Sequence, residues 1–519
     1  MDPVIVVGAG PVGLALALAL ARQDVPTVLL ESEQGEPPPR RARSCVLRDD
    51  TTVLVHRLTG ALAPAGLRWT VWRTLHRRQT VQQVDFADGG APFHFCRHDL
   101  TEALRAAARR QDLIHFAEDN RLAELEQDHE GVSAVTRGRH GTTWRGSYLV
   151  GCDGARSTVR KLLDVRFPGR TSVERHAVAV LRVDLPWPEE ALLHREPADR
   201  QPEVCARSLP DGVWRLDWLL PARGELVTPQ ELMDRVGTTL RGWTGTADPS
   251  YELLDTGVHT AHQRLARRWR SGRAFLAGDA AHQLGALGTQ PVDEGLRDAD
   301  NLAWKLALAW HQGATEELLD SYQAERRSAV GARLRATDQA LPLVRNGSGL
   351  RSRLPGAART PLALLTDGHL GRGPLGAPAG HRRSPLAPAP RLMTEVATDA
   401  GDPVADVPVT DLHGVGGPLR LRLGRELLVV LIAPGTGVWD SRHWLHAGVM
   451  PELAAAVRRL PLPAELLVAE RYPGAAPHTV LLVRPDGHLA AALPGVRPEA
   501  LRSCADALLG LGAPEPAQE

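Results

Sequence analysis

A glycine-rich segment at the start of the chain constrains its fold most. The apolar run 4–7 precedes Gly8-Ala9-Gly10-Pro11-Val12-Gly13, and the apolar run 14–21 follows it. Four β-branched residues favour a buried strand, and the leucine- and alanine-rich run favours a helix. A strand, a G-x-G-x-x-G turn and a helix in this order are typical of a doubly wound α/β fold that binds a dinucleotide.

Each part of this turn has its own task in such a fold. Gly8 allows the tight turn, Gly10 lets the backbone approach a pyrophosphate, and Gly13 lets the helix pack on the sheet. The helix begins at Pro11-Val12, where free N–H groups and the helix dipole favour a diphosphate. A second apolar run ends at Glu31, about 20 residues on, where a carboxylate would accept hydrogen bonds from ribose hydroxyls. An unrelated glycine-rich turn is the alternative, but the acidic strand end in register favours a bound dinucleotide.

Two later segments indicate whether the bound dinucleotide is FAD or NAD. The chain runs from Leu149-Val150 into Gly151-Cys152-Asp153-Gly154, and from Phe275-Leu276-Ala277 into Gly278-Asp279. Both patterns predict a strand that enters a turn, and the second ends in an exposed carboxylate. A carboxylate at Asp279 can accept hydrogen bonds from the ribitol hydroxyls of a flavin, for which NAD has no counterpart. The three segments together favour FAD over NAD.

In this order and spacing, the segments resemble group A flavoprotein monooxygenases, the class typified by para-hydroxybenzoate hydroxylase. Within that class the chain most resembles the actinobacterial hydroxylases that tailor aromatic polyketides. The resemblance covers about residues 4–330 strongly and the remainder weakly. It extends to the stretch 41–47, which matches an arginine-bearing loop of the family, and to 298–306, which matches the signature helix D-A-x-N-L-x-W-K-L.

The resemblance implies a set of FAD contacts beyond the first turn. Arginines would contact the cofactor at Arg41, Arg43 and Arg97, and acidic turns would do so at Asp153 and Gly278-Asp279. The family's flavin loop would add Gly288, Val292 and Asp293. His282 belongs to the same motif and is expected to order the turn rather than act as a base. No catalytic side chain is identified.

The chemistry implied by the resemblance uses three small molecules. NADPH or NADH reduces FAD, the reduced flavin reacts with O2 to give a C4a-hydroperoxide, and one oxygen atom passes to a small aromatic substrate. The expected substrate is a polycyclic aromatic polyketide of secondary metabolism. Baeyer–Villiger oxygenation uses the same family of flavin adducts and stays open. A non-hydroxylating FAD oxidase or a structural FAD protein stays open as well.

The flavin loop departs from the family pattern G-D-A-A-H-x-x-P-P-x-G-G-Q-G-x-N-x-G. Gly285 and Ala286 replace both prolines, Thr289 and Pro291 replace glycines, and Asp293 replaces asparagine. Two positions of the Asp293 carboxylate are open. It either faces the flavin pyrimidine, where it would oppose an anionic reduced flavin, or it caps the helix that begins beside it.

The pattern of elements predicts an α/β protein with three parts and a linker. The first is a discontinuous Rossmann-type FAD-binding domain (1–72, 98–170 and 272–345), and the second is an inserted β-sheet substrate domain (73–97 and 171–271). A Pro/Gly-rich linker with little regular structure (346–400) follows. The third part is a thioredoxin-like α/β domain (401–512) of order βαββα. The last part has no redox cysteine pair. A packing or dimer-contact role is expected there, so a homodimer stays open.

Alternation along 212–220 predicts one strand of the substrate domain. Trp214, Leu216 and Trp218 share one face of it, and the opposite face carries Arg215-Asp217-Leu219. The tryptophan face either packs in a core or lines an aromatic pocket. The sequence alone does not distinguish these two alternatives.

Composition excludes several other classes of function. The 519 residues have a formal net charge of zero, so no large basic field favours nucleic acid. No run of about 20 apolar residues predicts a membrane span. Five cysteines without a C-x-x-C pair argue against a disulfide framework or a metal site. We therefore expect a cytoplasmic enzyme with no metal, no nucleic-acid partner and no membrane.

Overall fold

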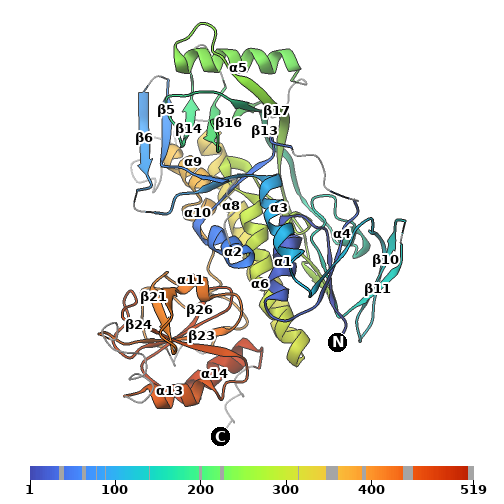
Figure 1. Ribbon diagram of the computed structural model, residues 1–519, viewed down its shortest axis with the longest axis vertical. Helices are drawn as coiled ribbons and strands as arrows, with labels where there is room; N and C mark the ends of the chain where they lie inside the picture. Colours follow the sequence, from blue (N-terminus) through green and yellow to red (C-terminus); the bar gives the residue numbers. More distant parts are fainter. Residues whose placement is uncertain are drawn as a thin grey trace.

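The structure is a computed structural model of the chain (Figure 1). It describes residues 1–33, 35, 40–60, 66–77, 79–87, 89–139, 141–197, 202–221, 227–313, 315–345, 360–388, 393–435 and 448–511. The fold is mixed α/β with several separate sheets. In Figure 1 the largest sheet lies at one end of the molecule, the C-terminal sheet lies toward the other, and α6 runs between them.

The N-terminal glycine segment belongs to a six-stranded sheet of order β18-β19-β12-β1-β2-β8. All neighbours pair in parallel except β18, which runs antiparallel to β19. The strands are β1 (Val4–Val7), β2 (Thr27–Leu30), β8 (Ile114–Ala117), β12 (Tyr148–Gly151), β18 (Arg270–Ser271) and β19 (Ala274–Leu276). The helices around it are α1 (Pro11–Ala21), α2 (Asp49–Thr59), α3 (Arg97–Ala108), α4 (Thr158–Leu162) and α6 (Pro291–Gln312). Apolar residues of β1 and α1 are buried in its core, and the β-branched run 4–7 forms the buried strand that the sequence predicted.

Two three-stranded sheets flank this part. They consist of β9 (Arg121–Gln127), β10 (Val132–Arg137) and β11 (Thr143–Gly146), and of β3 (Ser44–Leu47), β4 (Gly66–Arg68) and β7 (Phe93–Cys96). The prediction placed β7, within 73–97, in the inserted domain. It pairs instead with β3, with Ser44 opposite Cys96, because its four buried residues complete the layer beside α3.

The inserted sheet has eight strands in the order β20-β17-β13-β16-β15-β14-β5-β6. They are β5 (Val71–His76), β6 (Gln79–Asp85), β13 (Gly169–Arg182), β14 (Glu190–Arg195), β15 (Val204–Ser208), β16 (Val213–Leu220), β17 (Glu252–Leu265) and β20 (His282–Gln283). Helix α5 (Pro229–Thr244) covers one face, where Trp214, Leu216 and Trp218 pack against its apolar side. The tryptophan face is therefore core, and the face with Arg215 and Asp217 points the other way.

Helices continue past α6 into the segment predicted to be a linker. They are α7 (Glu316–Tyr322), η3 (Gln323–Arg327), α8 (Ser328–Arg345), α9 (Pro361–Leu370) and α10 (Gly373–Gly376). The expectation of little regular structure over 346–400 is wrong for α9 and α10; 346–359 and 389–392 lie outside the described residues. Helix α9 has Thr360 at its N-cap, Pro361 in its first turn and Gly371 at its C-terminus. Proline and glycine therefore begin and end a helix here instead of preventing one.

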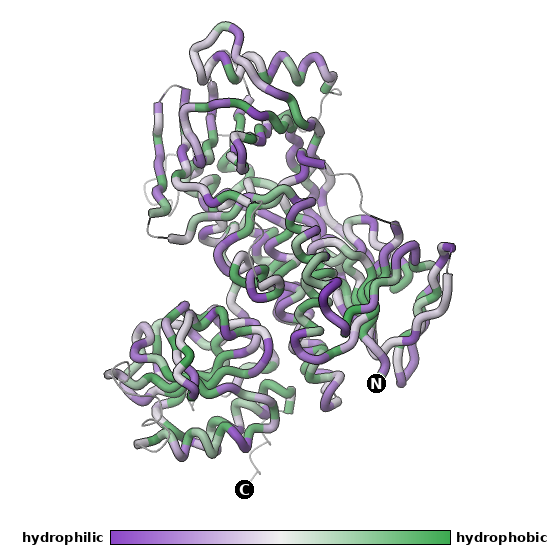
Figure 2. The backbone as a smooth tube through the Cα atoms, in the orientation of Figure 1, coloured by the Kyte–Doolittle hydropathy of each residue, from purple (hydrophilic) through white to green (hydrophobic). Residues whose placement is uncertain are grey.

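The C-terminal domain has a six-stranded sheet of order β22-β21-β24-β23-β25-β26. Its elements are β21 (Pro408–Asp411), β22 (Gly416–Pro418), α11 (Leu419–Arg422), β23 (Leu427–Ile432), α13 (Met450–Val457), β24 (Ala464–Ala469), β25 (Val480–Val483), β26 (Leu489–Leu493) and α14 (Pro498–Leu508). The predicted βαββα order corresponds to β23, α13, β24, β25 and α14, and it omitted β21, β22, α11 and β26. The alanine-rich sequence of β26 has weak strand propensity. Figure 2 shows apolar residues along the central strands of this domain and of the N-terminal sheet. Cys504 is fully buried in the C-terminal core.

A buried group of ionic side chains joins this domain to α6 and η3. Lys305 Nζ lies 2.7 Å from Glu325 Oε2, and Arg484 Nη1 lies 2.7 Å from Glu325 Oε1. Arg484 also pairs with Asp486, and Asn301 donates hydrogen bonds to both Glu325 and Asp486. We call these five residues the junction cluster. Each of its charges has a partner, so it fixes one domain against the other.

Candidate active site

The first glycine turn has the geometry of a dinucleotide-binding loop. Gly8 adopts a φ of +104°, and a Cβ there would collide with the backbone of Cys152. A Cβ at Gly13 would collide with the carbonyl oxygen of Gly8, so the helix could not start so close to the strand. A Cβ at Gly10, by contrast, has no atom within 4 Å. Open space at Gly10, beside the free N–H groups of the first turn of α1, fits a diphosphate.

Glu31 lies at the end of β2 beside this turn. Its Oε2 accepts a hydrogen bond from the N–H of Ala9 at 2.9 Å, and its Oε1 accepts one from the N–H of Ser32 at 2.7 Å. The carboxylate is thus fixed next to the glycine loop, where the sequence placed it. Its contact with a ribose stays a prediction.

The first and third segments meet at Val12. A Cβ at Gly278 would come within 3.0 Å of Val12 Cγ2, and one at Gly295 would approach the same atom at 2.5 Å. These two glycines therefore let the turn after β19 and the start of α6 pack against the start of α1. The structure brings the predicted turns of the first and third segments into one region.

His282 orders the third turn, as the sequence analysis expected. His282 Nε2 donates to Asp298 Oδ2 at 2.7 Å, and the N–H of Gly278 donates to the same oxygen at 3.0 Å. Arg326 pairs with the other oxygen of Asp298 at 2.9 Å. Because both His282 and Asp298 are fully buried, this histidine holds backbone in place and does not face a substrate.

In the second segment, the two carboxylate oxygens of Asp153 lie in different environments. Asp153 Oδ2 accepts hydrogen bonds from the N–H groups of Thr158 and Val159, at 2.6 and 3.0 Å, so this oxygen caps α4. Asp153 Oδ1 is buried and has no partner among the described residues. Arg160 donates to the carbonyl of Ala280 at 2.9 Å and so links this segment to the third one. One oxygen of Asp153 thus stays free for a cofactor group.

A cavity of about 470 Å³ lies between these turns and the eight-stranded sheet. Five residues predicted to contact FAD line it, namely Arg43, Arg97, Asp279, Gly288 and Val292. Arg41 is exposed and lies outside this lining. The open space at Gly10, the free oxygen of Asp153 and the carboxylate of Asp279 at the cavity wall together fit a bound FAD.

Asp293 takes neither of the positions left open by the sequence. The residue at the N-cap of α6 is Gln290, so capping by Asp293 is wrong. Its Oδ2 pairs with Arg48 Nη1 at 3.0 Å, and its Oδ1 accepts hydrogen bonds from Thr51 Oγ1 and from the N–H of Arg48. Burial raises the pKa of Asp293, while Arg48 beside it acts in the opposite direction. The carboxylate is bound by residues of α2 and its N-cap, its charge is paired, and it lies outside the cavity lining; its effect on a flavin stays a prediction.

The altered loop before α6 is held from two sides. The N–H of Leu287 donates to Glu174 Oε2 of β13 at 2.9 Å. A Cβ at Gly368 would collide with the carbonyl of Leu287, so α9 packs directly on the loop. Leu287 adopts a φ of +53°, a conformation unusual for a leucine, and its buried side chain in the core beside α9 keeps it there. Sequence reasoning missed α9 as part of this site.

The roof of the cavity is the face of the eight-stranded sheet opposite α5. It carries His259 on β17, His176 on β13, Asp217 and Arg215 on β16, and Arg207 on β15. Arg215 donates to the carbonyl of Ala42 at 2.8 Å and so ties the loop beside Arg43 to the roof. The signal for this face was present in the sequence, because charged residues alternate with tryptophans along β16.

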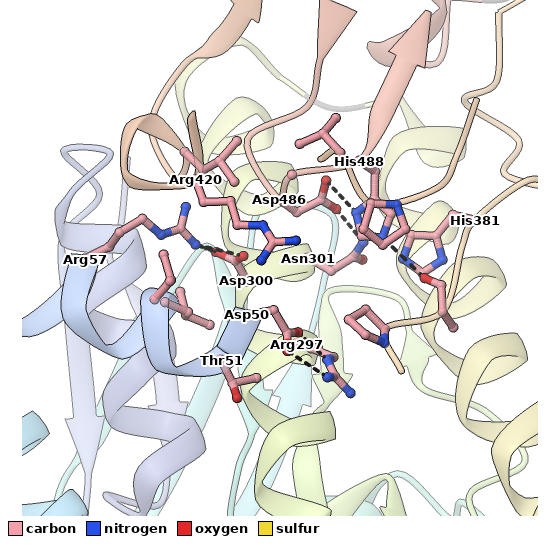
Figure 3. Close-up of a pocket in the computed structure, with 18 of the residues that line it drawn as sticks. Asp50, Thr51, Arg57, Arg297, Asp300, Asn301, His381, Arg420, Asp486 and His488 are labelled. Atoms are coloured by element: carbon pink, nitrogen blue, oxygen red, sulfur yellow. Dashed lines mark hydrogen bonds and ion pairs between the residues drawn. The ribbon is translucent and has the colours of Figure 1, made fainter. Parts of the chain in front are cut away.

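A second cavity, of about 80 Å³, lies between α2, α6 and the C-terminal domain (Figure 3). Figure 3 shows two ion pairs among its lining residues, Arg57 with Asp300 and Arg297 with Asp50. Their N–O distances are 3.0 and 2.8 Å. None of the residues predicted to bind FAD lines it. It belongs to the contact between domains.

The described residues contain no group of three or more metal-ligating side chains placed to hold a metal ion. Within the same residues, no helix is long and apolar enough to cross a membrane.

Residues 1–337 match the model of the FAD binding domain family, and the chain belongs to this family. FAD is its cofactor, and NAD(P)H is the usual reductant in the family. The resemblance to flavin-dependent hydroxylases is thereby confirmed, and the protein is an enzyme.

Two relatives and one solved structure show the extent of this similarity. The rifampicin monooxygenase of Streptomyces venezuelae is 34% identical over 389 residues, which are 71% of this chain and 76% of that protein. A putative polyketide hydroxylase of Streptomyces halstedii is 29% identical and aligns with 94% of this chain and 92% of its own. The structure of the OxyS anhydrotetracycline hydroxylase of Streptomyces rimosus superposes with a TM-score of 0.69 at 26% identity, covering 99% of this chain and all of that one.

Proposed function

We propose that the protein is an FAD- and NAD(P)H-dependent monooxygenase that inserts one atom of O2 into a polycyclic aromatic polyketide by hydroxylation. The observation that carries this proposal is the cavity of about 470 Å³, where predicted FAD-binding residues and the sheet roof face one another. A single space with cofactor residues on one side and free wall on the other suits a substrate held against a flavin. Polyketide substrates are supported by the relatives that resemble the chain over nearly its whole length.

The chain's own residues have distinct tasks in this proposal. Gly10 and the first turn of α1 hold the diphosphate, Glu31 holds a ribose, and Asp279 holds the ribitol chain. Arg43 and Arg97 stand at the cofactor side of the cavity. Bound FAD, once reduced, supplies the activation of O2. The roof sheet and α9 orient the substrate and exclude water.

Two other functions were left open by the sequence, Baeyer–Villiger oxygenation and a non-hydroxylating FAD protein. Baeyer–Villiger oxygenation needs the same cavity and cofactor and remains the second candidate for a ketone substrate. A non-hydroxylating FAD protein was suggested by the altered flavin loop, above all by the charge of Asp293. Because Arg48 pairs with that charge, this objection to hydroxylation falls away.

The division of the chain belongs to the same proposal. We assign 1–70, 98–170 and 270–345 without β20 to FAD binding, together with β7, and we assign 171–269 with β5, β6 and β20 to substrate binding. The C-terminal domain, which we take to be thioredoxin-like, serves packing or dimer contact. Its cysteine, Cys504, is buried, so it takes no part in thiol exchange.

The test is reduction and O2 consumption by purified holoenzyme. We expect NADPH or NADH to bleach the flavin anaerobically, and we expect a polycyclic phenol to raise O2 consumption and to become oxygenated. O2 consumption that yields only H2O2 with every aromatic compound tried would favour an oxidase instead.

A further inference from the structure

The roof of the cavity carries an unusual number of charged side chains for a site that takes an aromatic compound. Three arginines and three carboxylates of the lining belong to it or reach it: Arg207, Arg215, Arg345, Glu174, Glu203 and Asp217. Buried charges are costly unless they are paired, so the pairing shows which group is left for a ligand.

At one end of the roof, Arg345 forms ion pairs with two carboxylates. It lies 2.6 Å from Glu174 and 2.8 Å from Glu203. Glu203 has a second partner just behind the lining, because Arg195 Nε lies 3.1 Å from it. Both arginines at this end are engaged, and both carboxylates are neutralised.

At the other end, two arginines share one carboxylate. Arg215 binds Asp217 through Nε and Nη2, at 2.9 and 2.6 Å. Arg207 Nη2 lies 3.8 Å from Asp217, which is too far for a hydrogen bond. Together with Arg195, the two ends of the roof contain four arginines but only three carboxylates. One positive charge is therefore left without a carboxylate of its own, and it belongs to Arg207.

The guanidinium of Arg207 is also poor in hydrogen bonds. Within the part of the chain that the structure describes, no oxygen atom accepts a hydrogen bond from it, and its nearest polar neighbours are the carboxylate of Asp217 and the thiol of Cys205. Burial raises the pKa of Cys205, so its sulfur is a neutral thiol and a weak acceptor. An arginine has five N–H donors, and its side chain here is only 11% exposed. Arg207 lines the cavity, and its N–H groups have no oxygen acceptor among the described residues.

The histidines of the cavity add no further charge. Burial lowers the pKa of His176 to about 3, lowers that of His259, and lowers that of His369 well below its ordinary value. All three are neutral near pH 7 and offer hydrogen bonds without charge. Arg207 is thus the one strong electrostatic feature that the described roof presents to a ligand.

We propose that Arg207 recognises an acidic oxygen of the substrate, so that the enzyme takes aromatic compounds that carry a carboxylate or an equally acidic group. This inference rests on the proposed function, because it concerns the substrate side of the same cavity. Arg207 is a specificity-determining residue, which binds the anion through charge-assisted hydrogen bonds and takes no part in the chemistry at the flavin.

The test compares two probes of the same size and ring system, 1-hydroxy-2-naphthoic acid and 1-hydroxy-2-naphthamide, of which only the first is an anion at pH 7.5. Their dissociation constants are measured at pH 7.5 by the change in the flavin absorbance spectrum of the holoenzyme. We expect the acid to bind the natural enzyme about 10- to 100-fold more tightly than the amide, as charge-assisted hydrogen bonds imply. Arg207→Gln should remove this preference while leaving the affinity for the amide within about twofold, and Arg207→Lys should restore part of it.

The control variant is Arg182→Gln. Arg182 lies on β13 of the same sheet but is exposed and pairs with Glu252 at the surface. It should leave both dissociation constants unchanged. A natural enzyme that binds the acid no better than the amide, or does not bind it, overturns the inference. So does an Arg207→Gln variant that weakens both probes equally, because that result indicates a structural role.

Binding of the probes tests the role of Arg207, and their oxygenation tests the proposed function. Selective binding of the acid, lost in Arg207→Gln, supports the inference even if neither probe is oxygenated. Oxygenation of the amide and not the acid supports the proposed function and overturns the inference.

Discussion

Two buried groups of charged residues in this protein differ in how completely they are paired. In the junction cluster, Glu325 alone accepts hydrogen bonds from Lys305, Arg484, Asn301 and Ser384. In the cavity, Arg207 has a carboxylate at 3.8 Å, and Asp279, Arg43 and Arg97 line the wall. The first group is closed on itself, and the second presents unused donors and acceptors to an open space.

This difference separates structural charges from binding charges. A buried charge whose partners are all supplied by the chain stabilises one arrangement of domains and has nothing left for a ligand. A charge that the chain leaves half-paired, at a cavity wall, is stabilised further when a ligand completes it. The predictions below test whether the two groups behave in these two ways.

The largest effect is expected at the junction cluster. Glu325→Gln leaves Lys305 and Arg484 buried without their shared carboxylate, and it should lower the free energy of unfolding by about 3–5 kcal/mol. Urea denaturation followed by circular dichroism measures this. Glu499→Gln, on the exposed face of α14, is the matched control and should have almost no effect. Equal curves for Glu325→Gln and the natural protein would show that the cluster does not hold the domains together.

A mutation in the cavity should weaken cofactor binding and leave the stability of the fold nearly unchanged. Asp279→Ala removes the acceptor that we propose for the ribitol chain of FAD, so FAD affinity should fall about 10- to 100-fold, equivalent to about 1.5–3 kcal/mol. Unfolding of the apoprotein should stay near that of the natural protein, because Asp279 makes no hydrogen bond in the described chain. Fluorescence titration with FAD and urea denaturation measure the two effects. Unchanged FAD affinity contradicts the assignment of this turn.

A pH dependence follows from the buried histidine between the roof and the loop before α2. Burial lowers the pKa of His94 to about 3, and its ring nitrogens bond Ser208 and Ser44. Because the unfolded chain then binds the proton more readily, stability is complete above about pH 6.5 and falls as the pH drops toward 3.

At pH 5 this effect amounts to about 2 kcal/mol for one such histidine. His94→Gln should reduce the loss of stability between pH 6.5 and 5, measured by urea denaturation at each pH. His129→Gln, at an exposed site, should leave the pH profile unchanged. A profile that is as steep in His94→Gln as in the natural protein shows that this histidine titrates normally.

The smallest effect is expected for the flavin in Asp293→Asn. Since the carboxylate pairs with Arg48 and lies outside the cavity lining, the reduction potential should move by less than about 30 mV, equivalent to 1.4 kcal/mol for two electrons. Titration with a redox dye measures it. A larger shift would mean that the charge does act on the flavin.

Parts of this site could be predicted because their signals are local. The strand, glycine turn and helix over 4–21 lie within one stretch of sequence, and so do the turns at Gly278-Asp279 and Asp153. The alternation in β16 also separated its apolar face from its charged one. In each case neighbouring residues determine the geometry.

Other parts depend on contacts that no local pattern carries. Asp293 pairs with Arg48, 245 positions away, so its environment required the folded chain. Helix α9 was missed because Pro361 and Gly371, which suggested a linker, stand in its first turn and at its C-terminus, and β26 was missed because alanine has weak strand propensity. The excess charge at Arg207 emerges only when partners from β14, β16 and α8 are counted together.

The most direct test of the central claim is incorporation of oxygen from labelled O2. Holoenzyme, NADPH and a polycyclic phenol that perturbs the flavin spectrum are incubated under ¹⁸O2, and the product is analysed by mass spectrometry. The account predicts a product that contains one ¹⁸O atom per molecule, with the second atom recovered in water. Consumption of ¹⁸O2 with all label in hydrogen peroxide and none in the aromatic compound would contradict it.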